Sequence, residues 1–261
     1  MAATRQCRIL ASGQHNLLIS IAMVHFYLFR RRQVWLPTLL GWLVLLAIIV
    51  TACVIAGWNI YALLAPNDPA PRARILVVEG WMAEKELDQA VALFRNGKYE
   101  RIVTTGGPIE DWVELRGSLT YAELAASYLK KHGLEGTEVT AVSAPASAQD
   151  RTFLSAVTVR NWAAKQRLAV EALDVFSAGA HGQRSRMLYR MAFGPNIDVG
   201  VLSARQQKYD ERHWWRTTAA TKSVLEETIG LLWTMCCFHP APPGSHEEMW
   251  GVPPPAGHLE R

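Results

Sequence analysis

Short apolar runs recur along the second part of the chain. Each is rich in Val, Ile or Leu and is typical of a strand buried on both faces of a parallel sheet. The five runs are ILVV at 75–78, IVTT at 102–105, EVTAV at 138–142, LDVFS at 173–177 and IDVGVL at 197–202.

Amphipathic segments follow these runs. Leu87, Ala90, Val91 and Phe94, for example, repeat at helical spacing and form one apolar stripe. Helices are expected at about 87–96, 121–132, 151–166, 183–193 and 217–234. Because strands and helices alternate, the sequence predicts a three-layer α/β domain with a mainly parallel sheet of about five strands.

A long uncharged segment precedes this domain. No charged side chain occurs from Gln33 to Asn67, and the apolar stretch at 34–65 exceeds the roughly 20 residues that a membrane-spanning helix requires. A buried core helix would keep a polar stripe, and a cleaved signal peptide would have a shorter apolar core. The sequence therefore predicts one transmembrane helix, with the lipid bilayer as a partner.

The arginines at 30–32 set the expected orientation, because positive residues next to a span favour the cytoplasmic side. We expect residues 1–33 in the cytoplasm and the α/β domain outside the inner (plasma) membrane, in the periplasm or its extracytoplasmic equivalent. Met23 is an alternative start, and residues 1–22 would then be an extension upstream of it.

Proline-rich segments bound the α/β domain. Residues 66–73 are expected to form a stiff connector, because a helix does not continue through their prolines. The folded domain is expected at 74–238. The six prolines after residue 238 predict a disordered tail at 239–261.

Charge excludes one class of partner. The chain has 27 basic and 23 acidic residues, but residues 1–65 hold five arginines and no acid, so the rest is nearly neutral. Nucleic-acid binding needs basic residues clustered on the domain itself, and no nucleic-acid partner is expected.

The adjacent Cys236 and Cys237 fit neither a disulfide framework nor a zinc site, and two thiols are expected there.

Candidate chemistry follows four of the strands. In a Rossmann-like sheet, ligands bind beyond the carboxyl ends of the strands, near the switch in strand order. The candidate ligand-binding residues are Glu79 and Gly80 after the first strand, Gly106 and Gly107 after the second, Arg151 and Thr152 after the third, and His181, Arg184 and Arg186 after the fourth. Imidazole and guanidinium groups at a helix start can hold a phosphate, a pyrophosphate or a carboxylate, and His181 could also act as a catalytic acid or base.

Each signal also has a plainer interpretation. The glycine pair at 106–107 fits a tight turn, and either Arg184 or Arg186 alone fits a solvated helix residue. A metal held by His181 with Asp150 or Glu79 matches no known ligand spacing, so no metal is expected. The dinucleotide-binding pattern GxGxxG, the P-loop pattern GxxxxGK[ST] and the hydrolase pattern GxSxG do not follow the expected strands. The sequence therefore does not indicate which cofactor, if any, the domain binds.

The last expected helix ends in IGLLWTMCCF, which is too short to span a bilayer. It either docks on the domain or touches the membrane surface. Trp214 and Trp215, which precede it, are expected to be packing or interfacial aromatics.

The segments FRNGKY, TTGGP, TYAELAASYLKKHGL, DRT and SAGAHGQRSR, in this order, resemble the SanA/YdcF/ElyC family of bacterial envelope proteins. The resemblance covers about residues 74–203 and extends to the single N-terminal anchor. It implies a Rossmann-like domain linked to envelope integrity and to peptidoglycan or its lipid carrier. The biochemical activity of the family is not settled.

The resemblance also assigns residues. The glycine pair at 106–107 matches the family's glycines, Thr152 matches the threonine of its Asn-Thr-x-Glu-Asn segment, and His181 and Arg184 match its His-x-x-Arg. Three departures change the expected chemistry. Arg151 replaces the family asparagine, Leu154 and Ser155 replace the following Glu and Asn, and Tyr121 replaces another glutamate. The loss of two carboxylates and the gain of an arginine favour anion binding over acid–base or metal chemistry.

Three functions are expected in order of preference. The first is a membrane-anchored envelope-biogenesis factor that binds a phosphate-bearing small molecule or lipid-linked precursor. The second is a hydrolase or transferase that acts on a phosphate-bearing or nucleotide substrate. The third is a non-catalytic scaffold for cell-wall enzymes and other envelope proteins.

Overall fold

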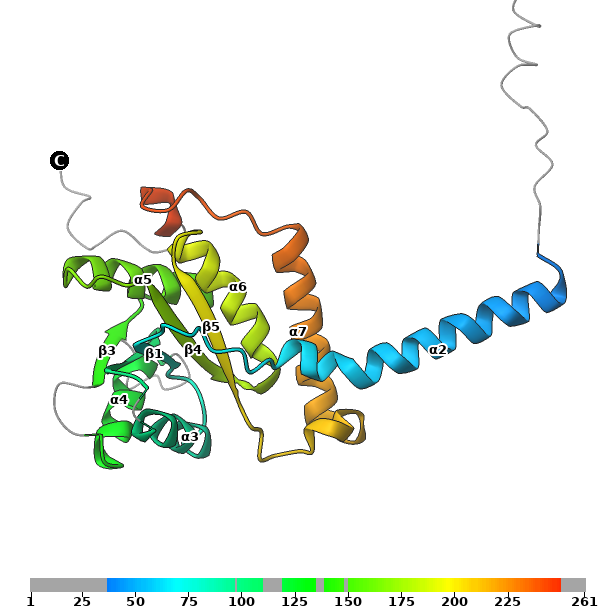
Figure 1. Cartoon of the computed structure of the whole chain (residues 1–261), viewed down its shortest axis with the longest axis horizontal. Helices are drawn as coiled ribbons and strands as arrows, with labels where there is room; N and C mark the ends of the chain where they lie inside the picture. Colours follow the sequence, from blue (N-terminus) through cyan, green and yellow to red (C-terminus); the bar gives the residue numbers. More distant parts are fainter. Residues whose placement is uncertain (1–36, 97, 110–118, 135–138, 148–149, 250–261) are drawn as a thin grey trace, which may run out of the picture. The chain divides into compact units, whose positions relative to one another are not determined.

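The computed structural model describes residues 37–96, 98–109, 119–134, 139–147 and 150–249. Five parallel strands form one sheet in the order β3-β2-β1-β4-β5 (Figure 1). The strands are β1 (Ile75–Glu79), β2 (Arg101–Gly106), β3 (Val139–Ser143), β4 (Ala172–Ala178) and β5 (Asp198–Ala204). The helices are α2 (Leu39–Leu64), α3 (Glu84–Arg95), α4 (Tyr121–Lys131), α5 (Arg151–Lys165), α6 (Gly182–Phe193) and α7 (Thr218–Cys236), with 3-10 turns η3 (Gly179–His181), η4 (Glu211–Arg216) and η5 (His246–Met249).

The core has two halves, one on each face of the sheet. Successive side chains of a strand point to opposite faces, so Leu76 and Val78 pack with α3 and α4, whereas Val77 packs with α5 and α6. Both faces are covered (Figure 1). This explains why the strands read as continuous apolar runs, and it confirms the three-layer α/β, Rossmann-like fold.

The described residues divide into two units, with the boundary between Ala52 and Cys53. Among the described residues, only α2, Leu39–Leu64, is long and apolar enough to cross a membrane, and its most apolar stretch is not buried. This supports a single membrane span within the expected range 34–65. The cytoplasmic segment 1–33 and the three arginines lie outside the described residues, so the orientation stays a prediction.

The segment expected as a connector packs on the domain instead. Asp68 and Val201 of β5 exchange two backbone hydrogen bonds of 2.9 and 3.0 Å. Ser203 donates from its amide to the side chain of Asn67 at 3.0 Å and from its hydroxyl to the carbonyl of Pro66 at 2.8 Å. Residues 66–73 therefore cover the edge of β5, where unpaired backbone groups would otherwise need partners.

Asp174, which is fully buried in β4, ties this segment to the sheet. Its carboxylate accepts hydrogen bonds from the amide of Ala70 at 2.7 Å, the ammonium of Lys98 at 2.7 Å and the hydroxyl of Tyr99 at 2.6 Å. Burial and the bond to Asp174 raise the pKa of Tyr99. Gly200 leaves room for the segment, because a Cβ there would collide with the Ala70 amide and the Asp174 carboxylate.

The described part of the expected disordered tail also folds onto the domain. Arg160 of α5 donates two hydrogen bonds, of 2.7 and 2.6 Å, to Glu248, whose side chain is 2% exposed. Burial opposes the charge of Glu248, but bonds from Arg160 and Gly244 outweigh it and lower its pKa. The prediction of a disordered tail is therefore wrong for residues 239–249, and residues 250–261 lie outside the described range.

The end of α7 corrects a third expectation. Cys236 and Cys237 form a disulfide, whereas two thiols were expected. Cys237 is the first residue after α7 and has left the helical conformation, with φ −130° and ψ −19°.

We expect Asp174→Ala to lower the free energy of unfolding by about 3 kcal/mol, because it leaves buried donors without their acceptor. Chemical unfolding of the full chain in detergent would measure this loss. Glu171→Ala is the control, since the Glu171 pair with Arg72 has both side chains more than 70% exposed and should matter little. Equal losses in the two variants would contradict this role of Asp174.

Candidate functional site

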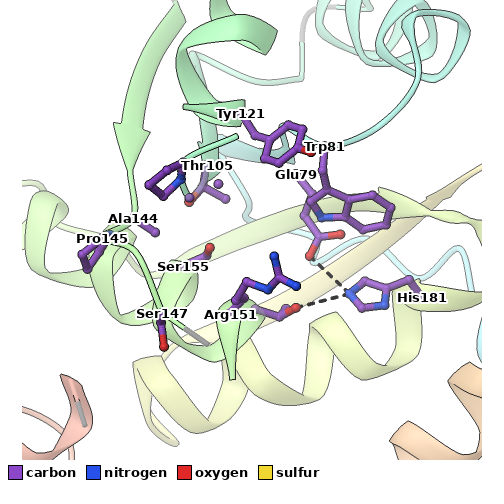
Figure 2. Close-up of a pocket in the computed structure, with 14 residues that line it drawn as sticks. Glu79, Trp81, Thr105, Tyr121, Ala144, Pro145, Ser147, Arg151, Ser155 and His181 are labelled. Carbon is purple, nitrogen blue, oxygen red and sulfur yellow. Dashed lines mark hydrogen bonds and ion pairs between the residues drawn. The ribbon is translucent and has the colours of Figure 1, made fainter. Parts of the chain in front are cut away.

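A cavity of about 300 Å³ lies at the carboxyl ends of β1 to β4 (Figure 2). The chain places β2 and β3 on one side of β1 and then β4 and β5 on the other, so β1 and β4 flank the switch in strand order. Ligands of open α/β sheets bind at this position. The lining residues are Glu79, Trp81, Thr105, Gly106, Gly107, Pro108, Tyr121, Ala144, Pro145, Ser147, Arg151, Thr152, Ser155 and His181.

Six of the candidate residues line this cavity. They are Glu79, Gly106, Gly107, Arg151, Thr152 and His181. Gly80 does not line the cavity. Glycine is required at this position because a Cβ would collide with the carbonyl of Tyr121 at the start of α4. Arg184 lies behind His181 and contacts its ring rather than the cavity.

Arg186 does not belong to this site. Its guanidinium pairs with the carboxylate of Asp68 at 2.7 Å, and its side chain is 15% exposed. The structure therefore places this predicted ligand-binding residue outside the cavity. Asp68 lies 118 residues away in the sequence, within the supposed connector, and nothing in the sequence pattern linked the two.

Local backbone features bring the site residues together. Gly179 has φ +41°, a left-handed conformation that favours glycine, and it turns the chain from β4 into η3, which ends at His181. Thr120 caps α4 by accepting from the amide of Glu123 at 3.2 Å, while the Glu123 carboxylate accepts from the amide of Thr120 at 2.9 Å. This capping box places Tyr121 against the cavity.

His181 is the most connected side chain of the site, and it is 7% exposed. Its Nδ1 lies 2.9 Å from the Oε1 atom of Glu227 and 3.0 Å from the Nη2 atom of Arg184. A ring nitrogen cannot donate to one and accept from the other at once. Arg184 also donates to Glu227, at 2.8 and 3.2 Å. We therefore assign His181 Nδ1 and Arg184 as donors to the same Glu227 carboxylate, because this assignment gives His181, Arg184 and Glu227 each a partner.

Glu227 was not among the candidate residues. Burial opposes its charge, but the hydrogen bonds and charges of His181 and Arg184 outweigh burial and lower its pKa from 4.5 to about 2. The carboxylate is therefore ionised at neutral pH and fixes Nδ1 of His181 as a donor. One feature of the sequence did point to Glu227 as a residue with a buried partner. Ala220, Val224, Leu231 and Thr234 form the buried stripe of α7, and Glu227 occupies the middle of it.

The other ring nitrogen of His181 faces the cavity. Nε2 lies 3.4 Å from the hydroxyl of Thr152 and 3.8 Å from the carboxylate of Glu79, and Figure 2 shows Glu79 and His181 pointing toward one another. Glu79 is 3% exposed and accepts hydrogen bonds from Ser177 at 2.5 Å and Ser185 at 2.8 Å. Its charge is thus shared with hydroxyl groups of β4 and α6.

Two carboxylates therefore reach His181, one from β1 and one from α7. The family resemblance had suggested a site depleted of acids, because Leu154 and Tyr121 stand where the family has glutamates. Leu154 is buried and Tyr121 lines the cavity. Acidic side chains therefore lie beside His181, although not at those two positions.

The side of the cavity opposite His181 contains one notable hydroxyl. Thr105 of β2 is 1% exposed and lines the cavity, and its Oγ1 has no hydrogen-bond partner among the described residues. The first turn of α5, which contributes Arg151 and Thr152, faces the same space. Asp150 precedes that turn with φ +46° and makes no side-chain cap bond to any described residue. Burial raises the pKa of the Asp150 carboxyl.

Within the described ranges, no group of three or more His, Cys, Asp and Glu residues is arranged to hold a metal ion. No protein-family model matches the chain, and no curated protein or solved structure is significantly similar to it. The resemblance to the SanA/YdcF/ElyC family therefore stays a prediction from the quoted segments.

The lowered pKa of Glu227 predicts an acid-sensitive contribution to stability. Its folded pKa of about 2 lies below the ordinary 4.5, so the contribution is complete above pH 4.5 and disappears as the pH falls toward 2. A shift of this size corresponds to about 3 kcal/mol. We expect Glu227→Gln to lower the free energy of unfolding at pH 7. As the pH falls from 4.5 toward 2, the free energy of unfolding of this variant should decrease less than that of the natural chain.

Chemical unfolding at a series of pH values would test this expectation. Glu226→Gln removes the same charge from the next position of α7, where the side chain is 65% exposed. That control should follow the acid profile of the natural chain. If both variants followed it, the ion cluster around Glu227 would not contribute as described.

Proposed function

We propose that this protein is a membrane-anchored envelope-biogenesis factor of the SanA/YdcF/ElyC type whose α/β domain, exported across the membrane, binds a phosphate-bearing ligand related to peptidoglycan or its lipid carrier. The observation that carries the proposal is the buried hydroxyl of Thr105, which has no hydrogen-bond partner in the described part of the chain and lies in a cavity that Arg151 also lines. A buried polar atom normally has a partner, and a ligand oxygen would supply it.

Three groups support an oxyanion as that ligand. Arg151 and the hydroxyl of Thr152 lie in the first turn of α5, where backbone N–H groups favour negative charge. Guanidinium and hydroxyl donors are the usual partners of phosphate oxygens. Glu79 would repel a phosphate, but its two carboxylate oxygens already accept hydrogen bonds from Ser177 and Ser185.

Aromatic residues support a ligand larger than inorganic phosphate. Trp81 and Tyr121 border the cavity, and the Trp81 ring meets the edge of His181 with ring centres 5.2 Å apart (Figure 2). Aromatic faces pack against sugar rings and nucleobases. A volume of about 300 Å³ is at the lower end of small-molecule sites.

Two neighbouring threonines offer a matched test. Thr105→Val removes the unpartnered hydroxyl, so we expect unchanged or higher stability of the free protein and roughly tenfold weaker binding. Thr104→Val removes a hydroxyl that donates to the carbonyl of Ala122 at 2.7 Å, so it should lower stability by about 1 kcal/mol and leave affinity unchanged.

The measurement is the melting temperature of the full chain with inorganic phosphate, UDP-N-acetylglucosamine or undecaprenyl phosphate. A ligand at 100 times its Kd should add about 2.7 kcal/mol to the stability of the natural chain. The proposal would be wrong if none of the three probes raised the melting temperature. It would also be wrong if Thr105→Val and Thr104→Val weakened binding equally.

The geometry of His181 favours a second candidate, a hydrolase or transferase acting on the same class of ligand. Glu227 holds Nδ1 as a donor, which leaves Nε2 in the cavity as the atom that takes up or releases a proton. Arg151 would stabilise negative charge that develops on the substrate. This arrangement is that of an oriented general base or acid.

We expect His181→Ala to lower kcat by about 100-fold or more, since general acid–base catalysis contributes on that order, while affinity for the substrate stays nearly intact. Release of inorganic phosphate from undecaprenyl pyrophosphate, together with binding measured separately, would test the expectation. Equal loss of turnover and binding would favour the binding function, as would absence of turnover in the natural chain.

A further inference from the structure

Helix α7 has two faces of different character. Ala220, Val224, Leu231 and Thr234 form the buried face, together with Glu227. On the opposite face Leu225, Ile229, Leu232 and Trp233 are 52%, 67%, 58% and 49% exposed. An outward face is normally polar, and a contiguous exposed apolar patch marks a binding surface for a protein or a membrane.

The buried face of α7 contacts the end of the membrane-spanning helix. Tyr61 and Leu64, in the last two turns of α2, form one apolar cluster with Val224 and Leu231. Trp214, just before α7, donates from its indole nitrogen to the carbonyl of Gly57 at 3.1 Å. The end of α2 therefore lies against the inner face of α7, and the outer face of α7 stays exposed.

We propose that the outer face of α7, formed by Leu225, Ile229, Leu232 and Trp233, lies in the interface of the bilayer that α2 spans and gives the domain a second membrane contact. Its length and composition fit a helix that lies along the surface, because among the described helices only α2 qualifies to cross. The inference rests on the anchoring of α2 and not on the phosphate-bearing ligand.

Neighbouring side chains favour lipid over a protein as the occupant. Trp58 and Trp215 are 68% and 42% exposed near the contact between α2 and η4, and tryptophan prefers the headgroup level of a membrane. Arg212, Arg216 and Lys222 are exposed in η4 and the first turns of α7, where they suit anionic headgroups.

The second contact would hold the cavity close to the membrane. Glu227 on the inner side of α7 reaches His181 at 2.9 Å, while Leu225 and Ile229 face outward. A helix with its side chains is about 10 Å across, so His181 would lie roughly one helix diameter from the headgroups. A phosphate presented by a lipid would then be within reach of the site.

The test uses the full chain in liposomes of phosphatidylcholine and phosphatidylglycerol. A benzophenone amino acid replaces Ile229 in one variant and Leu124 of α4 in the control, where the residue is also apolar and 47% exposed. Both positions are exposed, so neither replacement disturbs the core. After irradiation we expect a mass increase of one phospholipid at position 229 and no lipid adduct at position 124.

Three outcomes would overturn the inference. Absence of a lipid adduct at position 229 would remove the membrane contact, and equal adducts at both positions would show that contact is not selective. A covalent dimer at position 229 would mean that a second copy covers this face. As a further check, the benzophenone amino acid can be placed at position 232 instead. The lipid adduct expected there should be lost when Leu225→Glu and Ile229→Glu are combined in the same chain. None of these readouts depends on the phosphate-bearing ligand.

Discussion

The burial of the Glu227 carboxylate against His181 and Arg184 fixes how α7 packs on the α/β domain. A carboxylate taken out of water is tolerated only when charged or hydrogen-bonded partners replace the solvent. Arg184 can approach because position 230 is glycine, where a Cβ would stand 3.1 Å from its Nε atom. The ion cluster joins η3, α6 and α7, and it turns the face of α7 that carries Glu227 toward the domain.

A second set of buried contacts makes the end of α2 and the segment after it part of the domain. Tyr61 and Leu64 pack with Ala180, the residue before His181, so the last turns of α2 lie against the loop that carries the site histidine. The following segment is held by Asp174 through the amide of Ala70. The segment was expected as a stiff connector, but it packs on the domain, since proline ends a helix and does not prevent packing.

Most secondary structure followed from local patterns. The apolar run at 75–78 became β1, Ile75–Glu79, and the segment expected at 121–132 became α4, Tyr121–Lys131. Such elements depend on spacing and on nearby signals such as the Thr120 cap, which are visible in a single sequence. The parallel sheet followed from their alternation. Its strand order then determined which loops meet at the cavity.

Apart from the adjacent cysteines at 236 and 237, the errors share a different cause, which is pairing between residues far apart in the sequence. Arg184 and Glu227 are separated by 43 residues, and Arg160 and Glu248 by 88. Charge partners at such distances leave no periodic trace, so Glu227 was missed and the described part of the tail was taken as disordered. The acid inside the apolar stripe of α7 was the one readable sign, because a charge at a buried position requires a partner.

The two ring nitrogens of His181 have different surroundings. A purely structural imidazole has both nitrogens satisfied by the protein. Here Nδ1 has a close partner in Glu227 at 2.9 Å, whereas the contacts of Nε2, at 3.4 and 3.8 Å, are long for hydrogen bonds. Nε2, which meets the hydroxyl of Thr152 at 3.4 Å, and the hydroxyl of Thr105, which has no partner among the described residues, thus line one cavity. A ligand with several oxygen atoms can satisfy both, which an apolar ligand cannot do.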